Sequence, residues 1–171
     1  MNKSRHIRFF TLIIITATFL SSCGYRFPGD PQKHAAMWQG TTLKIEGDGK
    51  KHHPVLAQRL KVKLANRLGM STKNTTDNKN TTLIIKLNPL DRTLILEDED
   101  GRADQYQITM TAKPTLMGFD KSPKYPTVKG STTYYELRGS ATTQTARNSA
   151  EIEALQSLSE ALVAVITSIK E

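Results

Sequence analysis

Apolar and polar residues alternate along much of the chain. Every second residue is apolar in most of Thr41–Glu46 and Thr81–Leu96, and such alternation is typical of strands that bury one face. Ala103–Met117 continues the same pattern, and Tyr125–Arg138 follows it more weakly. The pattern therefore predicts four β-strands.

The second predicted strand carries an irregularity. Its apolar residues fall on odd positions up to Leu87 and on even positions at Leu94 and Leu96. One extra or missing residue produces such a change of parity, and proline is tolerated at a β-bulge. We therefore expect a bulge near Asn88-Pro89, with Leu94 and Leu96 facing inward.

A leucine at every fourth position predicts a helix from about His53 to Leu68. Pro54 lies in its first turn, where the missing N–H costs nothing, and Gly69 is the expected stop. The repeated residues are Leu56, Leu60, Leu64 and Leu68.

A second helix is predicted from Asn148 to Lys170. Asn148 followed by Glu151 indicates an N-cap with its capping-box partner, and Lys170 suits the negative end of the helix dipole. One apolar stripe runs along this helix through Ile152, Leu155, Leu158, Leu162, Val165, Ile166 and Ile169.

The order of these elements predicts an α+β fold for residues 41–171. We expect a two-layer β-α-β-β-β-α domain, in which a mostly antiparallel four-stranded sheet has two helices packed on one face. About 150 residues suffice to bury such a core without a disulfide or a metal.

The first 22 residues have the pattern of an export signal. Three cations precede Phe9–Leu20, an uncharged and mostly apolar run that is too short to span a bilayer, which needs about 20 residues. Leu20-Ser21-Ser22-Cys23 resembles the bacterial lipobox, in which the cysteine is lipidated and becomes the first mature residue. The alternative is an ordinary signal peptide cut nearby, which leaves a free thiol. The sequence thus predicts a signal peptide over 1–22 and a lipidated tether over 23–40.

The charge of the chain favours anionic partners. Removing the three signal cations from a formal charge of +8 leaves +5 for residues 23–171. An exported, lipid-anchored chain meets acidic lipids or phosphorylated glycolipids rather than nucleic acid. The same surplus could instead serve solubility alone.

No catalytic group, metal site or cofactor motif can be assembled from the sequence. The histidine pair His52-His53 has no cysteine or carboxylate pair beside it. The turn at Asp98 suggests a calcium loop, but Arg102 and Thr109 occupy positions where a calcium loop needs oxygen ligands. We therefore do not expect an enzyme.

The lipobox is followed by Cys23-Gly24-Tyr25-Arg26-Phe27 and Pro28-Gly29, and with the predicted order of elements this start resembles the LptE family of lipopolysaccharide-assembly lipoproteins. The resemblance implies a non-enzymatic subunit at the outer membrane, facing the periplasm or a barrel lumen. Such a subunit plugs the LptD β-barrel, assists barrel assembly and binds lipopolysaccharide. The alternative is a generic envelope lipoprotein that acts as an adhesin or a structural link.

Three arginines are the candidate lipopolysaccharide-binding residues. If the last three strands form a meander, Arg102 lies near Arg138, with Arg92 about three rungs away, and arginine binds phosphate with two oxygens at once. The acidic residues 97–100 oppose this prediction unless they point elsewhere or hold divalent cations. Alternatively, Arg102 merely pairs with Glu97 across the hairpin.

Overall fold

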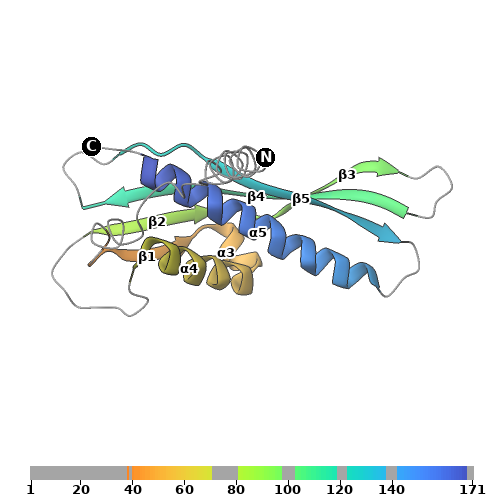
Figure 1. Cartoon of the computed structure of the whole chain (residues 1–171), viewed down its shortest axis with the longest axis horizontal. Coiled ribbons are helices and arrows are strands. Elements are labelled where there is room, and N and C mark those ends of the chain that lie inside the picture. Colours follow the sequence, from red (N-terminus) through yellow and green to blue (C-terminus); the bar gives the residue numbers. More distant parts are fainter. Residues whose placement is uncertain are drawn as a thin grey trace, which may run out of the picture. The chain divides into compact units, whose positions relative to one another are not determined.

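The computed structural model describes residues 38, 40–70, 81–97, 103–118, 123–137 and 142–168 of the 171-residue chain. The chain divides into two units, residues 1–30 and 31–171, and every described residue belongs to the second (Figure 1). The predicted signal peptide, Cys23 and most of the predicted tether lie outside the described residues. Trp38, at the end of that tether, is buried in the core of the domain.

Five strands form one mixed sheet (Figure 1). They are β1 (Thr42–Glu46), β2 (Thr82–Leu87), β3 (Asp91–Glu97), β4 (Ala103–Met117) and β5 (Val128–Leu137). β1 runs parallel to β2, and every other pairing in the sheet is antiparallel. The expectation of a mostly antiparallel sheet is therefore confirmed.

The strand predicted over Thr81–Leu96 is divided into β2 and β3. Both pair with β4 along one edge, and β5 pairs along the other edge. Leu87 lies opposite Ala112 and Asp91 lies opposite Thr109, so the β2–β3 side uses one more residue than β4 does. The predicted bulge is thus confirmed, and it raises the number of strands from four to five.

A second irregularity in β3 changes the faces of its apolar residues. Leu94 lies opposite Tyr106, whereas Leu96 lies opposite Gln105, so Ile95 has no partner of its own. The extra residue turns Leu94 and Leu96 to opposite faces of the sheet. Their exposed fractions are 45% and 58%, so the expectation that both face inward is wrong.

The helices are α3 (Asp48–His52), α4 (Pro54–Leu68) and α5 (Thr142–Ser168). α4 connects β1 to β2, which can run parallel because a crossover of this length joins them. The predicted helix from about His53 is confirmed, with Pro54 in its first turn, and Gly69 ends the helix in the left-handed conformation with φ of 67°. The short helix α3 was not predicted.

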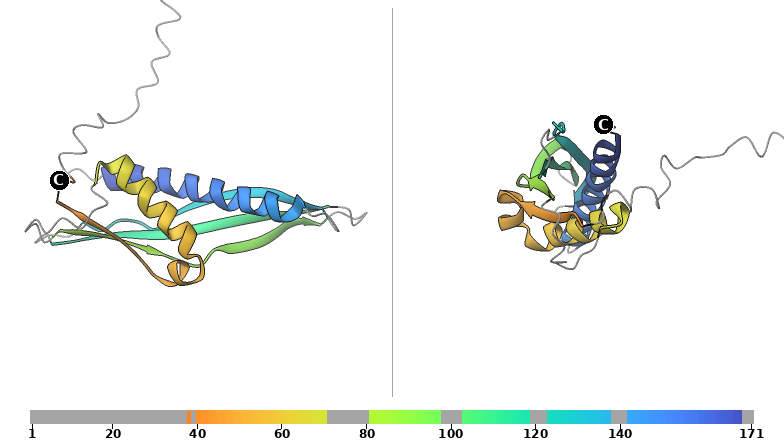
Figure 2. Two further views of the ribbon diagram at one scale, coloured as in Figure 1. Left: turned by 90° about the horizontal axis from the view of Figure 1, so that it is seen from below. Right: turned by 90° about the vertical axis from the view of Figure 1, so that its left-hand side faces the viewer.

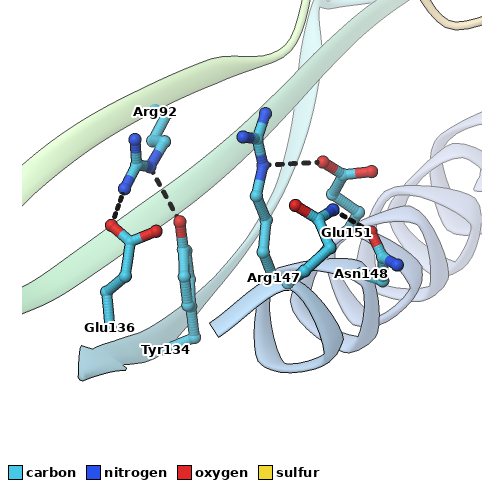
Figure 3. Close-up of polar contacts among 7 residues, drawn as sticks. Arg92, Tyr134, Glu136, Arg147, Asn148 and Glu151 are labelled. Carbon is cyan, nitrogen blue, oxygen red and sulfur yellow. Dashed lines mark hydrogen bonds and ion pairs between the residues drawn. The ribbon is translucent and has the colours of Figure 1, made fainter. Parts of the chain in front are cut away.

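α5 begins six residues before its predicted start, so the predicted N-cap at Asn148 is wrong. Asn148 lies in the second turn of α5, and its side chain accepts a hydrogen bond from Gln144 at 2.8 Å. Glu151 does not close a capping box but pairs with Arg147 at 3.3 Å, one turn earlier (Figure 3). The two residues that suggested an N-cap therefore form side-chain pairs one turn apart within a longer helix.

The helices α4 and α5 cover one face of the sheet (Figure 2). Gly130 on β5 lets α5 come into direct contact with the strand, because a Cβ there would collide with the backbone at Ala154 and Leu158. Among the described residues, no helix is long and apolar enough to cross a membrane. The sheet side of the core is formed by Leu43, Ile45, Leu83, Ile85, Leu87, Ile108, Met110, Ala112 and Leu116.

We expect Leu162→Ala to lower the free energy of unfolding by about 2–5 kcal/mol, because this side chain of α5 is completely buried. Ile152→Ala is the matched control, since Ile152 lies on the same helix but is 43% exposed. Urea denaturation of both variants measures the difference. Equal losses would show that the stripe of α5 does not form the core.

Candidate functional site

The strands β3, β4 and β5 continue past the end of β2 as a three-stranded antiparallel ribbon (Figure 1). Ala103 lies opposite Leu137 at the end of this ribbon. Arg102 precedes Ala103 and Arg138 follows Leu137, and both arginines lie outside the described residues. The predicted meander is therefore present, and it brings the neighbours of the two arginines together.

Arg92, the third predicted arginine, lies on β3 and reaches across β4 to β5 (Figure 3). Its Nε donates a hydrogen bond to the Tyr134 hydroxyl at 2.7 Å, and its Nη2 forms an ion pair with Glu136. The guanidinium carbon lies 3.7 Å from the ring centroid of Tyr106. Arg92 thus joins the edge strand β3 to the opposite edge strand β5.

These contacts stabilise the charged form of Arg92. Burial by itself lowers the pKa of the guanidinium, but the hydrogen bond to Tyr134 and the charge of Glu136 outweigh burial, so the pKa is raised. The rings of Tyr106 and Tyr134 stack with centroids 5.8 Å apart, which gives the guanidinium an aromatic surface. The charge of Arg92 is therefore already balanced within the ribbon.

The ribbon also exposes apolar side chains. Leu94, Ile95 and Leu96 on β3 are each about half exposed, and Tyr135 on β5 is exposed as well. Tyr135 and Leu96 both lie opposite Gln105, so these two side chains share the face of the sheet that the helices leave open. Leu96 and Tyr135 therefore place exposed apolar surface on the open face of the ribbon.

Four lysines, which sequence reasoning missed, lie farther along the open face. Lys86 and Lys113 are directly opposite each other on β2 and β4, an unfavourable like-charge pair, and Glu46 lies opposite Lys86 on its other side, on β1. Lys44 and Lys129 lie on the flanking strands, and all four side chains are exposed. Among the described residues, none of the four lysines forms an ion pair. The sequence could have indicated these lysines, because they occupy polar positions in strands where apolar and polar residues alternate.

A cleft of about 390 Å³ lies between β1 and α4. Three of the residues that line it are lysines, namely Lys44, Lys50 and Lys61, and Glu46 is the single carboxylate among them. This cleft was also missed, because it depends on how the helix crosses the edge of the sheet.

The histidine pair lines a second cleft, of about 430 Å³, between α4 and α5. Arg59 and Glu151 are among its other lining residues. Within the described ranges, no three side chains of His, Cys, Asp or Glu gather closely enough to hold a metal ion. The arrangement of the described residues therefore provides surfaces for binding, and we find no constellation among them that suggests catalysis.

Comparison with known protein families identifies the family of this chain. The family model described as LptE, lipopolysaccharide-assembly, matches residues 41–167, which include all the described strands and most of α5. The chain belongs to the LptE family. No curated protein sequence matches it significantly.

Several solved lipoprotein structures are similar to this LptE-family chain at low sequence identity. Rare lipoprotein B from Shewanella oneidensis is 11% identical with a TM-score of 0.44, and the match covers 74% of this chain and 92% of that one. A minor lipoprotein from Acinetobacter baumannii is 15% identical with a TM-score of 0.47, covering 78% and 94%. Lipoprotein B from Nitrosomonas europaea is 11% identical with a TM-score of 0.47, covering 85% and 93%.

We expect Arg92→Ala to lower the free energy of unfolding by about 1–3 kcal/mol, because it removes a charge-assisted hydrogen bond, an ion pair and an aromatic contact together. A double-mutant cycle with Glu136→Gln isolates the coupling between the two side chains, which we expect to be about 1 kcal/mol. The control is the cycle of Arg147 with Glu151, a pair within one helix that contributes about 0.3–0.5 kcal/mol. If the Arg92 cycle gives no coupling, the ion pair with Glu136 does not help to tie β3 to β5.

Proposed function

We propose that this LptE-family protein is a non-catalytic outer-membrane subunit of the lipopolysaccharide translocon. Cys23 carries the lipid anchor, and the domain of residues 41–171 plugs an LptD-like β-barrel, assists its assembly and binds lipopolysaccharide. The match of residues 41–167 to a lipopolysaccharide-assembly family supports this role. The subunit faces the periplasm or the lumen of the barrel and needs no cofactor.

The observation that carries the ligand part of this proposal is the exposed apolar group on the ribbon. Lipopolysaccharide combines phosphates with acyl chains, so a site for it needs cations beside an apolar surface. Leu96 and Tyr135 supply exposed apolar surface, and Arg102 and Arg138 adjoin the same end of the sheet in the sequence. Both parts of an amphipathic ligand can therefore be recognised at one place.

Arg92 has a supporting part in this site. Its guanidinium is held by Tyr134 and Glu136, so we propose that it orders the ribbon while Arg102 and Arg138 contact phosphate. Glu97, Asp104 and Glu136 occupy adjacent positions on the three strands of the ribbon. Arg92 offsets the charge of Glu136, which reduces the repulsion between this acidic row and a phosphate.

Binding of purified lipopolysaccharide by the full-length lipoprotein in detergent tests the proposed site. Charge-assisted hydrogen bonds contribute about 1.5–3 kcal/mol, so the double variant Arg102→Ala/Arg138→Ala is expected to bind at least about tenfold more weakly. Lys113→Ala/Lys129→Ala removes the same charge from the open face and serves as the control. Equal losses would indicate nonspecific charge attraction, and an unchanged affinity in the arginine variant would rule out the proposed site.

Co-purification separates the translocon role from that of a generic adhesin or structural link. A plug should leave the membrane with a large β-barrel in a one-to-one ratio, and that ratio should persist in high salt because a plugged lumen buries a large surface. Quantitative mass spectrometry of affinity-purified complexes measures the ratio. Recovery of the lipoprotein without a barrel would favour the alternative role.

A further inference from the structure

The strand β1 is an edge of the sheet, and one row of its backbone groups has no partner among the described residues. Among the described strands it pairs with β2 alone (Figure 1). The Thr42 N–H donates to the Thr81 carbonyl at 3.0 Å, so Thr42 directs its backbone groups toward β2. Successive residues of a strand direct these groups to opposite edges, and Leu43 and Ile45 therefore direct theirs to the free edge.

The cleft between β1 and α4 lies along this free edge. Ile45 lines it, and Pro54, Ala57 and Gln58 form part of its opposite wall on α4. A groove between an edge strand and a helix is the shape that accepts an extended peptide as an added strand. The free N–H and C=O of Ile45 can then bond with the backbone of that peptide.

The positive charge of the cleft favours an acidic peptide. Lys44, Lys50 and Lys61 face a single carboxylate, that of Glu46. The nearby carboxylate of Asp48 is bound to Lys51 at 2.9 Å, which lowers the pKa of Asp48. Lys44 on the edge strand itself also opposes pairing with a second copy of the same chain. The cleft is therefore complementary to an acidic segment and unfavourable for a second copy.

We propose that an extended, carboxylate-rich segment of the β-barrel partner adds to β1 as a sixth strand. This inference rests on the proposed function and names the surface by which the domain is held in the barrel. The free edge presents donors and acceptors at the two-residue spacing of a strand, which the backbone of an extended peptide matches in register, whereas the hydroxyl and phosphate groups of a glycolipid headgroup lack this regular spacing. A peptide therefore suits the edge better than the headgroup of a glycolipid.

Residue-resolved hydrogen exchange on the co-purified complex tests the added strand. The amides of Leu43 and Ile45 should exchange at least about tenfold more slowly in the complex than in the free lipoprotein, because they gain hydrogen bonds. The amides of Lys44 and Glu46 already face β2 and should not change. This alternation along one strand distinguishes an added strand from general shielding of the surface.

Charge reversal in the cleft provides the second measurement. We expect Lys61→Glu to weaken binding of the barrel about tenfold, because a carboxylate then faces an acidic segment. Arg59→Glu is the matched control, since Arg59 lies on the same helix, outside this cleft. We expect it to change the affinity less than about twofold.

The outcomes separate this inference from the function on which it rests. Protection at Leu43 and Ile45 with selective weakening by Lys61→Glu supports the added strand. A stable one-to-one complex without that protection overturns the added strand and leaves the translocon role intact, whereas failure to form the complex overturns both. Protection produced by lipopolysaccharide alone would assign the cleft to the glycolipid and would also overturn the inference.

Discussion

The backbone hydrogen bonds of β4 hold the sheet together. This fifteen-residue strand pairs with β2 and β3 along one edge and with β5 along the other, so three strands depend on it. β1 then joins through β2. Because one long strand serves several short ones, the sheet can extend past its helix-covered core as a ribbon. The surfaces proposed for binding follow from that extension and from the edge left open at β1.

The two faces of the sheet have different environments, and this difference organises the molecule. α4 and α5 cover the core part of one face, while the other face carries lysines, glutamines and threonines. On the open face Lys86 and Lys113 are directly opposite each other, and Glu46 opposite Lys86 offsets only part of the cost of this like-charge pair. This cost is consistent with a domain that meets anionic groups of a partner or ligand.

The ribbon illustrates how charge can serve structure and binding together. Arg92 offsets Glu136 and stacks on Tyr106, which orders strands that have little core beneath them. A cation engaged in this way contributes little to attraction of a free anion. Among the described residues, the lysines of the cleft beside β1 are consequently better candidates than Arg92 for contact with acidic groups.

The sequence by itself determined the elements whose signal is local. Alternation predicted the bounds of β4 and the bulge before β3, and Pro54 with Gly69 marked the ends of α4, because each depends on residues within one turn or strand. The class of fold and the meander that adjoins Arg102 and Arg138 also followed from the order of the predicted elements and from the two-residue period of the strands.

Only the tertiary structure decided the features that depend on distant residues. Ile95 has no partner because of its pairing with β4, and that pairing turned Leu94 and Leu96 to opposite faces. Arg92 finds its hydrogen-bond and ion-pair partners 42 and 44 residues away, and the cleft at β1 exists because α4 returns beside the edge. No local pattern encodes these contacts, because hydrogen bonding and packing between separate strands and helices create them.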